Sequence, residues 1–249
     1  MHSLLTVLGV LLQIVLVAAL ADLVAGFIHW IEDAYFTEHT PVIGPWFIRP
    51  NIVHHHQPRY FTRLTWWRSS KDLLFVGVAL LLGAWAIGRL SWQLWLFVIL
   101  SVNANQIHKW AHRTRAENGP VISALQDWHI LQTPRHHALH HSDPKNTYYC
   151  PITNLVNPVL ERIQFWNRLE AVIERLTGVA HRKDTAVRGQ GPGPEWLASY
   201  RDRPVIPPPP VAPRARCRCQ RCPGSCVTRP RQHAARIEMA HVSRRVPTP

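Results

Sequence analysis

HHALHH (His136–His141) is the stretch of this sequence that most restricts the fold, because six consecutive residues carry four imidazoles. HKWAH (His108–His112) places two further histidines four residues apart. Residues three or four positions apart share one face of an α-helix, so each stretch predicts a short helix with histidines on one side. Neutral imidazole binds iron, zinc, copper and nickel, and the pattern therefore indicates a metal site carried by helices.

Three more positions extend this pattern. HHH (His54–His56) lies upstream, His29 stands within GFIHW, and His129 precedes HHALHH. Asp33 follows His29 by four residues and can share its helical face as a ligand, as an acceptor that orients an imidazole, or as an ordinary solvated acid. The 16 histidines of the 249 residues gather in so few clusters that a metal site is favoured over histidines scattered in surface loops.

Apolar side chains make up 47% of the chain and gather in three long runs, at about 4–28, 73–88 and 92–107. Such segregation indicates a membrane protein rather than an evenly mixed globular core. The first run is long enough to cross a bilayer. ALA (19–21) also resembles a signal-peptide cleavage site, although no Lys or Arg precedes the run.

The second and third runs predict a helical hairpin, because only RLS (89–91) separates them. Each has about 16 residues, which is about 24 Å of helix at 1.5 Å per residue and short for a full span. Flanking tryptophans at the interface make such a span workable, and a buried hairpin in a soluble core is the alternative. We therefore expect an all-α membrane protein with about three transmembrane helices.

Three crossings would place every histidine cluster on one side of the membrane. The loops on that side carry many Lys and Arg residues, whereas the turn between the second and third runs offers only Arg89. The positive-inside rule then places a histidine-rich helical cap in the cytoplasm. We expect an integral protein of a bacterial inner membrane whose metal site faces the cytoplasm.

After the apolar runs, a stripe at helical spacing predicts an amphipathic helix over about 158–177, capped by Asn157, with Pro158 first and Gly178 at its end. This helix would lie on the bilayer surface or pack against the metal domain. The membrane domain is expected to cover residues 1–188.

Residues 189–249 predict a disordered tail rich in Pro, Arg and Cys, since they include four consecutive prolines (207–210) and eleven Arg against three acidic residues. The formal charge of +13 reflects this tail and the membrane-facing loops. No nucleic-acid-binding motif is visible, and no nucleic-acid partner is expected. Four tail cysteines are a possible zinc site but lack the paired CxxC spacing: Cys217, Cys219, Cys222 and Cys226.

Histidine-rich sites at the ends of membrane helices suit a non-haem di-iron centre, in which two irons take about eight nitrogen or oxygen ligands. With O2 as co-substrate, such a centre can break an unactivated C–H bond, and a membrane lipid substrate would explain its place at the membrane face. A membrane metal transporter is the alternative class. Transporters place ionisable groups inside their spans, whereas runs 73–88 and 92–107 contain none.

Several longer motifs carry a family resemblance. They are GFIHW (26–30) with Asp33, FIRP (47–50) before His54, NQIHKW (105–110) with His112, LQDWH (125–129), HHALHH (136–141) and LTG (176–178). In this order, over roughly residues 20–180, the chain resembles the plasmanylethanolamine desaturase family, also called the Kua or CarF family or the lipid desaturase domain.

The resemblance implies an enzyme that introduces a double bond into a lipid chain. Members of the animal and myxobacterial type convert an alkyl ether phospholipid to a vinyl ether, and a chloroplast relative desaturates an acyl chain of phosphatidylglycerol. The motifs look most similar to the vinyl-ether-forming branch, so O2-dependent 1',2'-desaturation is expected. An acyl-lipid desaturase or a hydroxylase of the same di-iron type is the alternative. Electrons would come from an external donor, either cytochrome b5-like or a ferredoxin.

The resemblance also implies the site residues. Asp33 is the candidate catalytic residue. His56 is left out because the family usually has another residue there, and His129 and His136 are weaker candidates. The expected ligands of two iron ions are His29, His54, His55, His108, His112, His137, His140 and His141.

Overall fold

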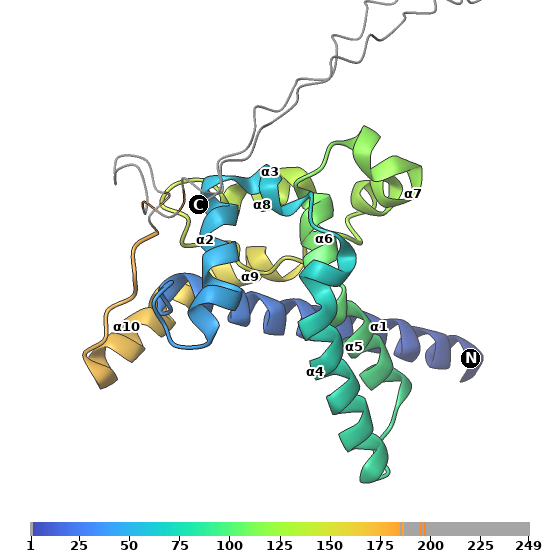
Figure 1. Cartoon of the computed structure of the whole chain (residues 1–249). Coiled ribbons are helices and arrows are strands. Elements are labelled where there is room, and N and C mark those ends of the chain that lie inside the picture. The colour runs from blue at the N-terminus through green and yellow to red at the C-terminus, as the bar shows by residue number, and fades with distance from the viewer. Residues whose placement is uncertain (1, 185, 187–194, 196, 198–249) are drawn as a thin grey trace, which may run out of the picture. The chain divides into compact units, whose positions relative to one another are not determined.

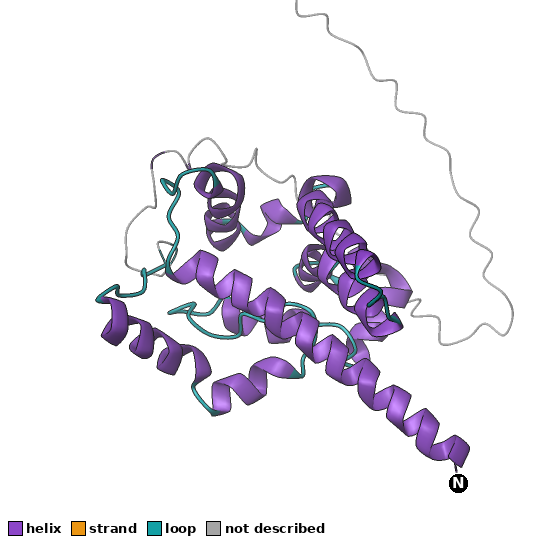
Figure 2. Cartoon of the chain, turned by 90° about the horizontal axis from the view of Figure 1, so that it is seen from below, coloured by secondary structure: helices purple, strands orange, loops and turns teal. Residues whose placement is uncertain are grey.

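The computed structural model describes residues 2–184, 186, 195 and 197, and within them every regular element is a helix (Figure 1, Figure 2). The predicted all-α class is therefore confirmed for this part of the chain. The predicted tail and its four cysteines fall outside the described residues, apart from Glu195 and Leu197. The elements are α1 (His2–Ala34), the π-helical turn η1 (Gly44–Ile48), α2 (Arg49–His56), α3 (Pro58–Phe61), α4 (Trp66–Ala86), α5 (Trp92–Val102), α6 (Ala104–Ala111), α7 (Arg115–Asp127), α8 (Pro134–His140), α9 (Val156–Arg162) and α10 (Phe165–Thr177).

Helix α1 is one of two described helices that are long and apolar enough to cross a membrane. Its 32 residues from Ser3 to Ala34 correspond to about 48 Å at 1.5 Å per residue, whereas a hydrocarbon core measures about 30 Å. No proline interrupts the helix at the predicted end of the run near residue 28. His29 and Asp33 therefore lie on the last turns of α1 rather than in a segment after the span.

The hairpin that the sequence predicts is formed by α4 and α5, which pack against each other. Helix α4, the second candidate span, begins at Trp66 rather than near residue 73, because the Thr65 hydroxyl caps it by accepting from a backbone N–H. The connecting turn uses Gly88 at a φ of +67°. The two helices approach closely at Gly77, where a Cβ would lie 2.8 Å from a methyl group of Val98.

The run predicted as a third span, 92–107, is divided at Asn103 into α5 and α6. The side-chain amide of Asn103 donates to the Ile99 carbonyl (2.9 Å), and its oxygen accepts from the indole N–H of Trp66 (3.0 Å). Because these bonds stop the helix, α5 keeps 11 residues, about 16 Å at 1.5 Å per residue. Two described helices are thus long enough to span, and a third span stays a prediction.

The predicted amphipathic helix over 158–177 is instead two helices, α9 and α10. Gln164 between them adopts a left-handed conformation (φ 50°), which no α-helix continues through. Asn157 does not cap a helix. It lies buried inside α9, where its side chain bonds both the N–H (3.0 Å) and the C=O (2.8 Å) of Cys150. Gly178 ends α10 as predicted, in a left-handed conformation.

Helix α10 packs against the end of α1 rather than lying apart from the metal domain. The Trp30 and Trp166 rings stack with centroids 5.5 Å apart, and the Trp30 indole N–H donates to Glu170 (2.9 Å). The opposite side of α10 stays open, since Leu176 is 78% exposed. Helix α10 therefore packs on the domain through one side, and contact of its open side with a bilayer surface stays a prediction.

The segment before α9 that contains Cys150, Ile152 and Thr153 packs along α1 and is hydrogen-bonded to it. The Asp22 carboxylate accepts from the backbone N–H of Ile152 (2.6 Å) and from the N–H and hydroxyl of Thr153 (3.0 and 2.6 Å). One helical turn further, a Cβ on Gly26 would lie 2.5 Å from Cys150 Sγ and 2.9 Å from Cys150 Cα. A glycine is needed there because the backbone of the segment passes directly over α1. This contact fixes the carbonyl groups that face the histidines of the site.

Candidate metal centre

Four helices bring all nine predicted site residues together in two adjacent groups. Within each group the ligand-type atoms lie within 4.8 Å of one another. We call the first set the five-histidine group and the second the aspartate group. The five-histidine group consists of His54, His108, His112, His137 and His141, and the aspartate group consists of His29, Asp33, His55 and His140.

Helices α1 and α6 each serve one group. His29 and Asp33 lie four residues apart at the end of α1 and both join the aspartate group. His108 lies in α6 and His112 directly follows it, and both join the five-histidine group. This is the shared helical face that the sequence predicts for residues four positions apart.

Helices α2 and α8 serve both groups. Consecutive residues on a helix point about 100° apart, so His54 and His55 of α2 face different groups. On α8, His137 and the following cap residue His141 face the five-histidine group, whereas His140 faces the aspartate group. The two groups are therefore held side by side by shared helices.

Four members of the five-histidine group present Nε2 atoms that face one another. Nε2 of His137 lies 2.9 Å from Nε2 of His108 and 3.1 Å from Nε2 of His141, which in turn lies 3.1 Å from Nε2 of His54. One nitrogen carries at most one hydrogen, so these contacts cannot all be hydrogen bonds at once. They match ligands of one metal instead, because nitrogens about 2.1 Å from a metal and at right angles are about 3.0 Å apart.

In the aspartate group, three imidazoles face one carboxylate oxygen. Oδ2 of Asp33 lies 3.6 Å from Nε2 of His29, 3.5 Å from that of His55 and 3.7 Å from that of His140. The other oxygen, Oδ1, accepts a hydrogen bond from the side-chain amide of Asn51. Asn51 thereby holds the carboxylate with Oδ2 towards the imidazoles.

Backbone carbonyls set the tautomer of two of these histidines. Nδ1 of His29 lies 3.1 Å from the Tyr149 carbonyl oxygen, and Nδ1 of His140 lies 2.8 Å from the Thr147 carbonyl oxygen. A carbonyl oxygen can only accept, so each Nδ1 carries the hydrogen and each Nε2 presents a lone pair to the centre. Metal-bound histidines typically donate their second ring N–H in this way.

This donor set fits a cation. In the aspartate group, lone pairs and a carboxylate oxygen converge and repel one another unless a positive charge lies between them. Nε2 of His29 and Oδ2 of Asp33 are buried and have no hydrogen-bond partner among the described residues, a condition that costs about 1–3 kcal/mol per group. Imidazole and carboxylate donors without thiolate suit iron among the transition metals. Both groups can therefore bind a metal ion, and iron is compatible with the donors.

The electrostatic environment keeps most of these imidazoles neutral. Burial, together with the neighbouring histidines, holds the pKa of His54, His108, His137 and His140 well below the ordinary value. The same causes lower the pKa of His112 to about 3. Neutral imidazole is the form that binds metals, so these five histidines need no costly deprotonation at neutral pH.

His55 is the exception. Burial lowers its pKa, but the carboxylates of Asp33 and Asp184 outweigh burial and raise the pKa overall. Asp184 lies 129 residues away in the sequence, and its carboxylate accepts from Nδ1 of His55. Sequence reasoning missed both Asp184 and Asn51, because neither stands in a histidine motif.

The three histidines that the sequence analysis left out or ranked lower lie outside both groups. Nδ1 of His129 contacts the Asn154 amide (2.7 Å), and His136 contacts the Asn157 amide (3.2 Å). His56 follows His54 and His55 on α2 and does not share their direction. Helical direction separates His56 and His136 from the centre although each adjoins a candidate ligand in sequence, whereas His129 lies in the turn after α7.

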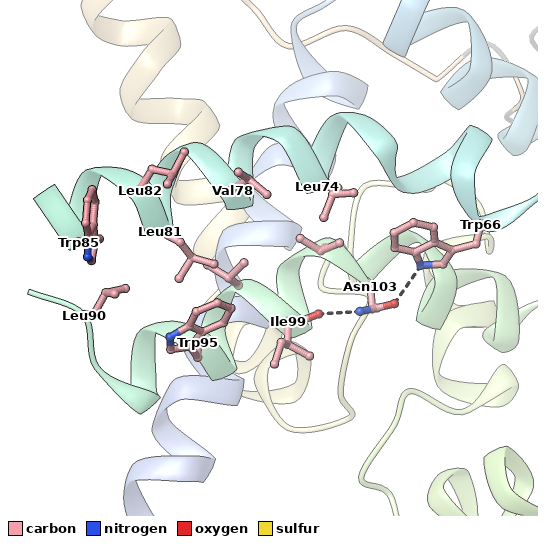
Figure 3. A pocket seen from close by; sticks show the side chains of 12 residues that line it. Trp66, Leu74, Val78, Leu81, Leu82, Trp85, Leu90, Trp95, Ile99 and Asn103 are labelled. Atoms are coloured by element: carbon pink, nitrogen blue, oxygen red, sulfur yellow. Dashed lines mark hydrogen bonds between the residues drawn. The ribbon is translucent and has the colours of Figure 1, made fainter.

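A groove of about 510 Å³ runs between α4 and α5 (Figure 3). Its lining is apolar almost throughout, with Trp85 and Leu90 at the end near the hairpin turn and Trp66 and Asn103 at the other end. Asn103 precedes His108 of α6 by five residues. The groove therefore ends close in sequence to the five-histidine group.

These features define a helical membrane protein with a candidate metal centre. Two described helices are long and apolar enough to span a bilayer, and two adjacent groups of buried side chains can bind metal ions. Residues 18–184 match the lipid desaturase domain family, and the chain belongs to this family. Family membership makes it an oxidoreductase of the desaturase type, and the histidine groups are compatible with an O2-dependent di-iron enzyme.

Three relatives are similar over most of the domain. A probable fatty acid desaturase of Acanthamoeba polyphaga mimivirus is 37% identical over 72% of this chain and 90% of the relative. The plasmanylethanolamine desaturase 1 of Mus musculus is 36% identical, with 70% of this chain and 69% of the relative covered. The plasmanylethanolamine desaturase of Myxococcus xanthus is 31% identical, with 70% and 64% covered. No solved structure matches the chain.

Proposed function

We propose that this lipid desaturase binds two iron ions and converts the alkyl chain of an ether phospholipid to a vinyl ether. The single observation that carries the metal part is the pair of adjacent groups, with nine ligand-type side chains in place. The substrate part is supported by the two relatives named plasmanylethanolamine desaturases, at 36% and 31% identity.

The proposed ligands divide between two positions. His54, His108, His112, His137 and His141 would hold one iron through imidazole nitrogens. The other iron would be held by His29, His55 and His140 together with Oδ2 of Asp33. When bound, the two irons supply O2 activation and the oxidising equivalents for C–H cleavage.

The overall reaction balances with an external reductant. The CH2–CH2 unit next to the ether oxygen becomes CH=CH and gives up two hydrogen atoms. O2 takes these two hydrogens together with two electrons and two protons, and two waters form. We propose that the two electrons come from a cytochrome b5-like protein or a ferredoxin, as the family resemblance implies.

The protein's own contribution is to position the alkyl chain of the lipid and to exclude water from the centre. The buried residues around the centre include His137 and His140, at 1% and 0% exposure. The apolar groove between α4 and α5 would accept hydrocarbon, which suits a substrate that enters from the membrane (Figure 3). We also propose that the centre faces the cytoplasm of a bacterial cell. The loops on the side of the histidine clusters carry many Lys and Arg residues, whereas the turn between α4 and α5 carries only Arg89.

The proposed vinyl ether formation is tested by expressing the protein in a host that lacks such desaturases and supplying an alkyl ether phospholipid. Vinyl ethers release aldehydes in acid, whereas alkyl ethers do not. Aldehyde release that requires both O2 and an intact His137 supports the proposal. His129→Ala, outside both groups, is the matched control and should leave aldehyde release unchanged.

Desaturation of an acyl chain is the second candidate. It is favoured by the mimivirus relative named a probable fatty acid desaturase and by the chloroplastic fatty acid desaturase 4 of Arabidopsis thaliana, which is 32% identical over 72% of this chain. In the same expression experiment, a new double bond confined to acyl chains would replace the ether assignment with this one.

A further inference from the structure

Residues 181–184 and 186 belong to no helix, and Asp184 among them lies against the aspartate group. The backbone N–H of Arg182 donates to the Ala34 carbonyl at the end of α1 (2.5 Å). The Lys145 ammonium group donates to the carbonyl of Ala186 (2.8 Å). These two bonds hold the segment beside Asp33, and both Asp33 and Asp184 line one cavity of about 290 Å³.

Asp184 is the residue of this segment that contacts a histidine of the aspartate group. Its Oδ2 accepts a hydrogen bond from Nδ1 of His55, while Nε2 of the same ring faces Asp33 at 3.5 Å. Its Oδ1 accepts from the backbone N–H of Ala186 (2.6 Å), which fixes the carboxylate plane. The side chains of His55 and Asp184 are 3% and 10% exposed, so their interaction is shielded from bulk water.

We propose that Asp184 is a positioning residue of the metal centre, which holds His55 in the tautomer that presents Nε2 and adds a negative charge to the aspartate group alone. This inference rests on the proposed metal centre. A carboxylate that accepts from a ligand histidine fixes the ring and raises the basicity of the ligating nitrogen. His29 and His140 donate to neutral carbonyls, so Asp184 brings the only such charge among the described contacts of this group.

The two groups therefore differ in the hydrogen-bond acceptors and negative charges that surround their histidines. Nδ1 of His54, His137 and His141 is buried without a hydrogen-bond partner in the described part of the chain. Among the described residues, these three histidines thus lack the anionic acceptor that Asp184 gives His55. We expect the aspartate group to bind a divalent metal more tightly, because its two carboxylates attract the cation and its histidines are fixed by oxygen acceptors.

The test uses the full chain, titrated with Fe(II) without O2 or with Co(II). Wild type is expected to bind two metal ions with unequal dissociation constants. Asp184→Ala should weaken the tighter site by about 10–100-fold, the usual effect of losing a residue that orients a metal ligand. Asp184→Asn keeps an oxygen that accepts from Nδ1 and loses only the charge, so it should weaken that site less.

Two controls separate positioning from folding. Asp127→Asn makes the same chemical change at an exposed carboxylate paired with Arg115 and should change neither site. The five-histidine group is the internal control, since Asp184→Ala should leave its metal bound with unchanged affinity. In iron-loaded protein, the Mössbauer signal of one iron should change in this variant while that of the other stays the same.

Several outcomes would overturn the inference. Two metals bound by Asp184→Ala with wild-type dissociation constants would show that the carboxylate does not support a ligand. An equal loss at both sites would show that Asp184 only stabilises the fold. Wild-type protein that binds two metals but desaturates no ether lipid would refute the proposed substrate and leave the role of Asp184 standing.

Discussion

Gly26→Ala is expected to destabilise the domain and to disturb the metal centre through the segment that crosses α1. The added methyl group would lie 2.5 Å from Cys150 Sγ, 2.9 Å from Cys150 Cα and 3.0 Å from Cys150 N. Contacts this short force the segment away from the helix. Overpacking of this kind costs about 1–3 kcal/mol, partly offset by the gain of up to about 1 kcal/mol for Ala over Gly in a helix.

The displacement should also reach the site, because Tyr149 adjoins Cys150 and its carbonyl faces Nδ1 of His29 at 3.1 Å. Thermal unfolding in detergent measures the stability, and metal titration measures the aspartate group. Gly9→Ala on the same helix is the matched control, since beyond the helix's own backbone no described atom lies within 4 Å of its added Cβ. It should be neutral or slightly stabilising.

A second substitution makes the prediction stricter. Cys150→Ala in the Gly26→Ala background removes the contact with Sγ but leaves those with backbone Cα and N. The double variant should therefore regain only part of the lost stability. Full recovery, or a Gly26→Ala protein as stable as the Gly9→Ala control, would refute the close approach as the reason for this glycine.

Three further outcomes are expected. His108→Ala should lose metal from the five-histidine group and abolish desaturation, which metal analysis and lipid analysis of the same preparation check. Ile99→Trp narrows the apolar groove and should lower kcat/KM by about tenfold, or ~1.4 kcal/mol, with iron content unchanged, whereas Phe75→Trp on α4, which does not line the groove, should have no effect. Truncation after Gly189 should leave iron content and activity intact, because the family match ends at residue 184; a loss of both would point to a role for the tail cysteines.

Local spacing predicted which histidines share a helical face, and the family resemblance supplied the full set of candidate ligands. His108 and His112, or His137 and His141, share a helical face whatever surrounds them. Asp33 was found in the same way, four residues after His29. Spacing alone did not show that the histidines divide into two groups, because the division depends on the direction of whole helices.

Asp184 illustrates what spacing cannot reveal. It meets His55 across 129 residues of sequence, in a segment with no helix of its own. The acceptor role of the Tyr149 and Thr147 carbonyls is equally hidden, since every residue has a carbonyl group. Only the path of the segment across Gly26 decides which carbonyls face the centre.

The helix ends were the least predictable part of the fold. The apolar pattern continues through residues 92–107, but the hydrogen bonds of Asn103 with Trp66 and Ile99 end α5 there. The stripe over 158–177 likewise continues through Gln164, where the backbone turns left-handed so that both helices pack on the domain. In both cases tertiary contacts override a correct local pattern.

The central claim is that two irons held by these groups desaturate a lipid chain with O2. The most direct measurement is a single turnover of purified, iron-loaded and chemically reduced protein with an alkyl ether phospholipid and O2. The account predicts two irons per chain and up to one acid-labile vinyl ether per two irons, with none formed without O2. Protein that holds two irons, is reoxidised by O2 and yields no double bond in ether or acyl chains would contradict the account.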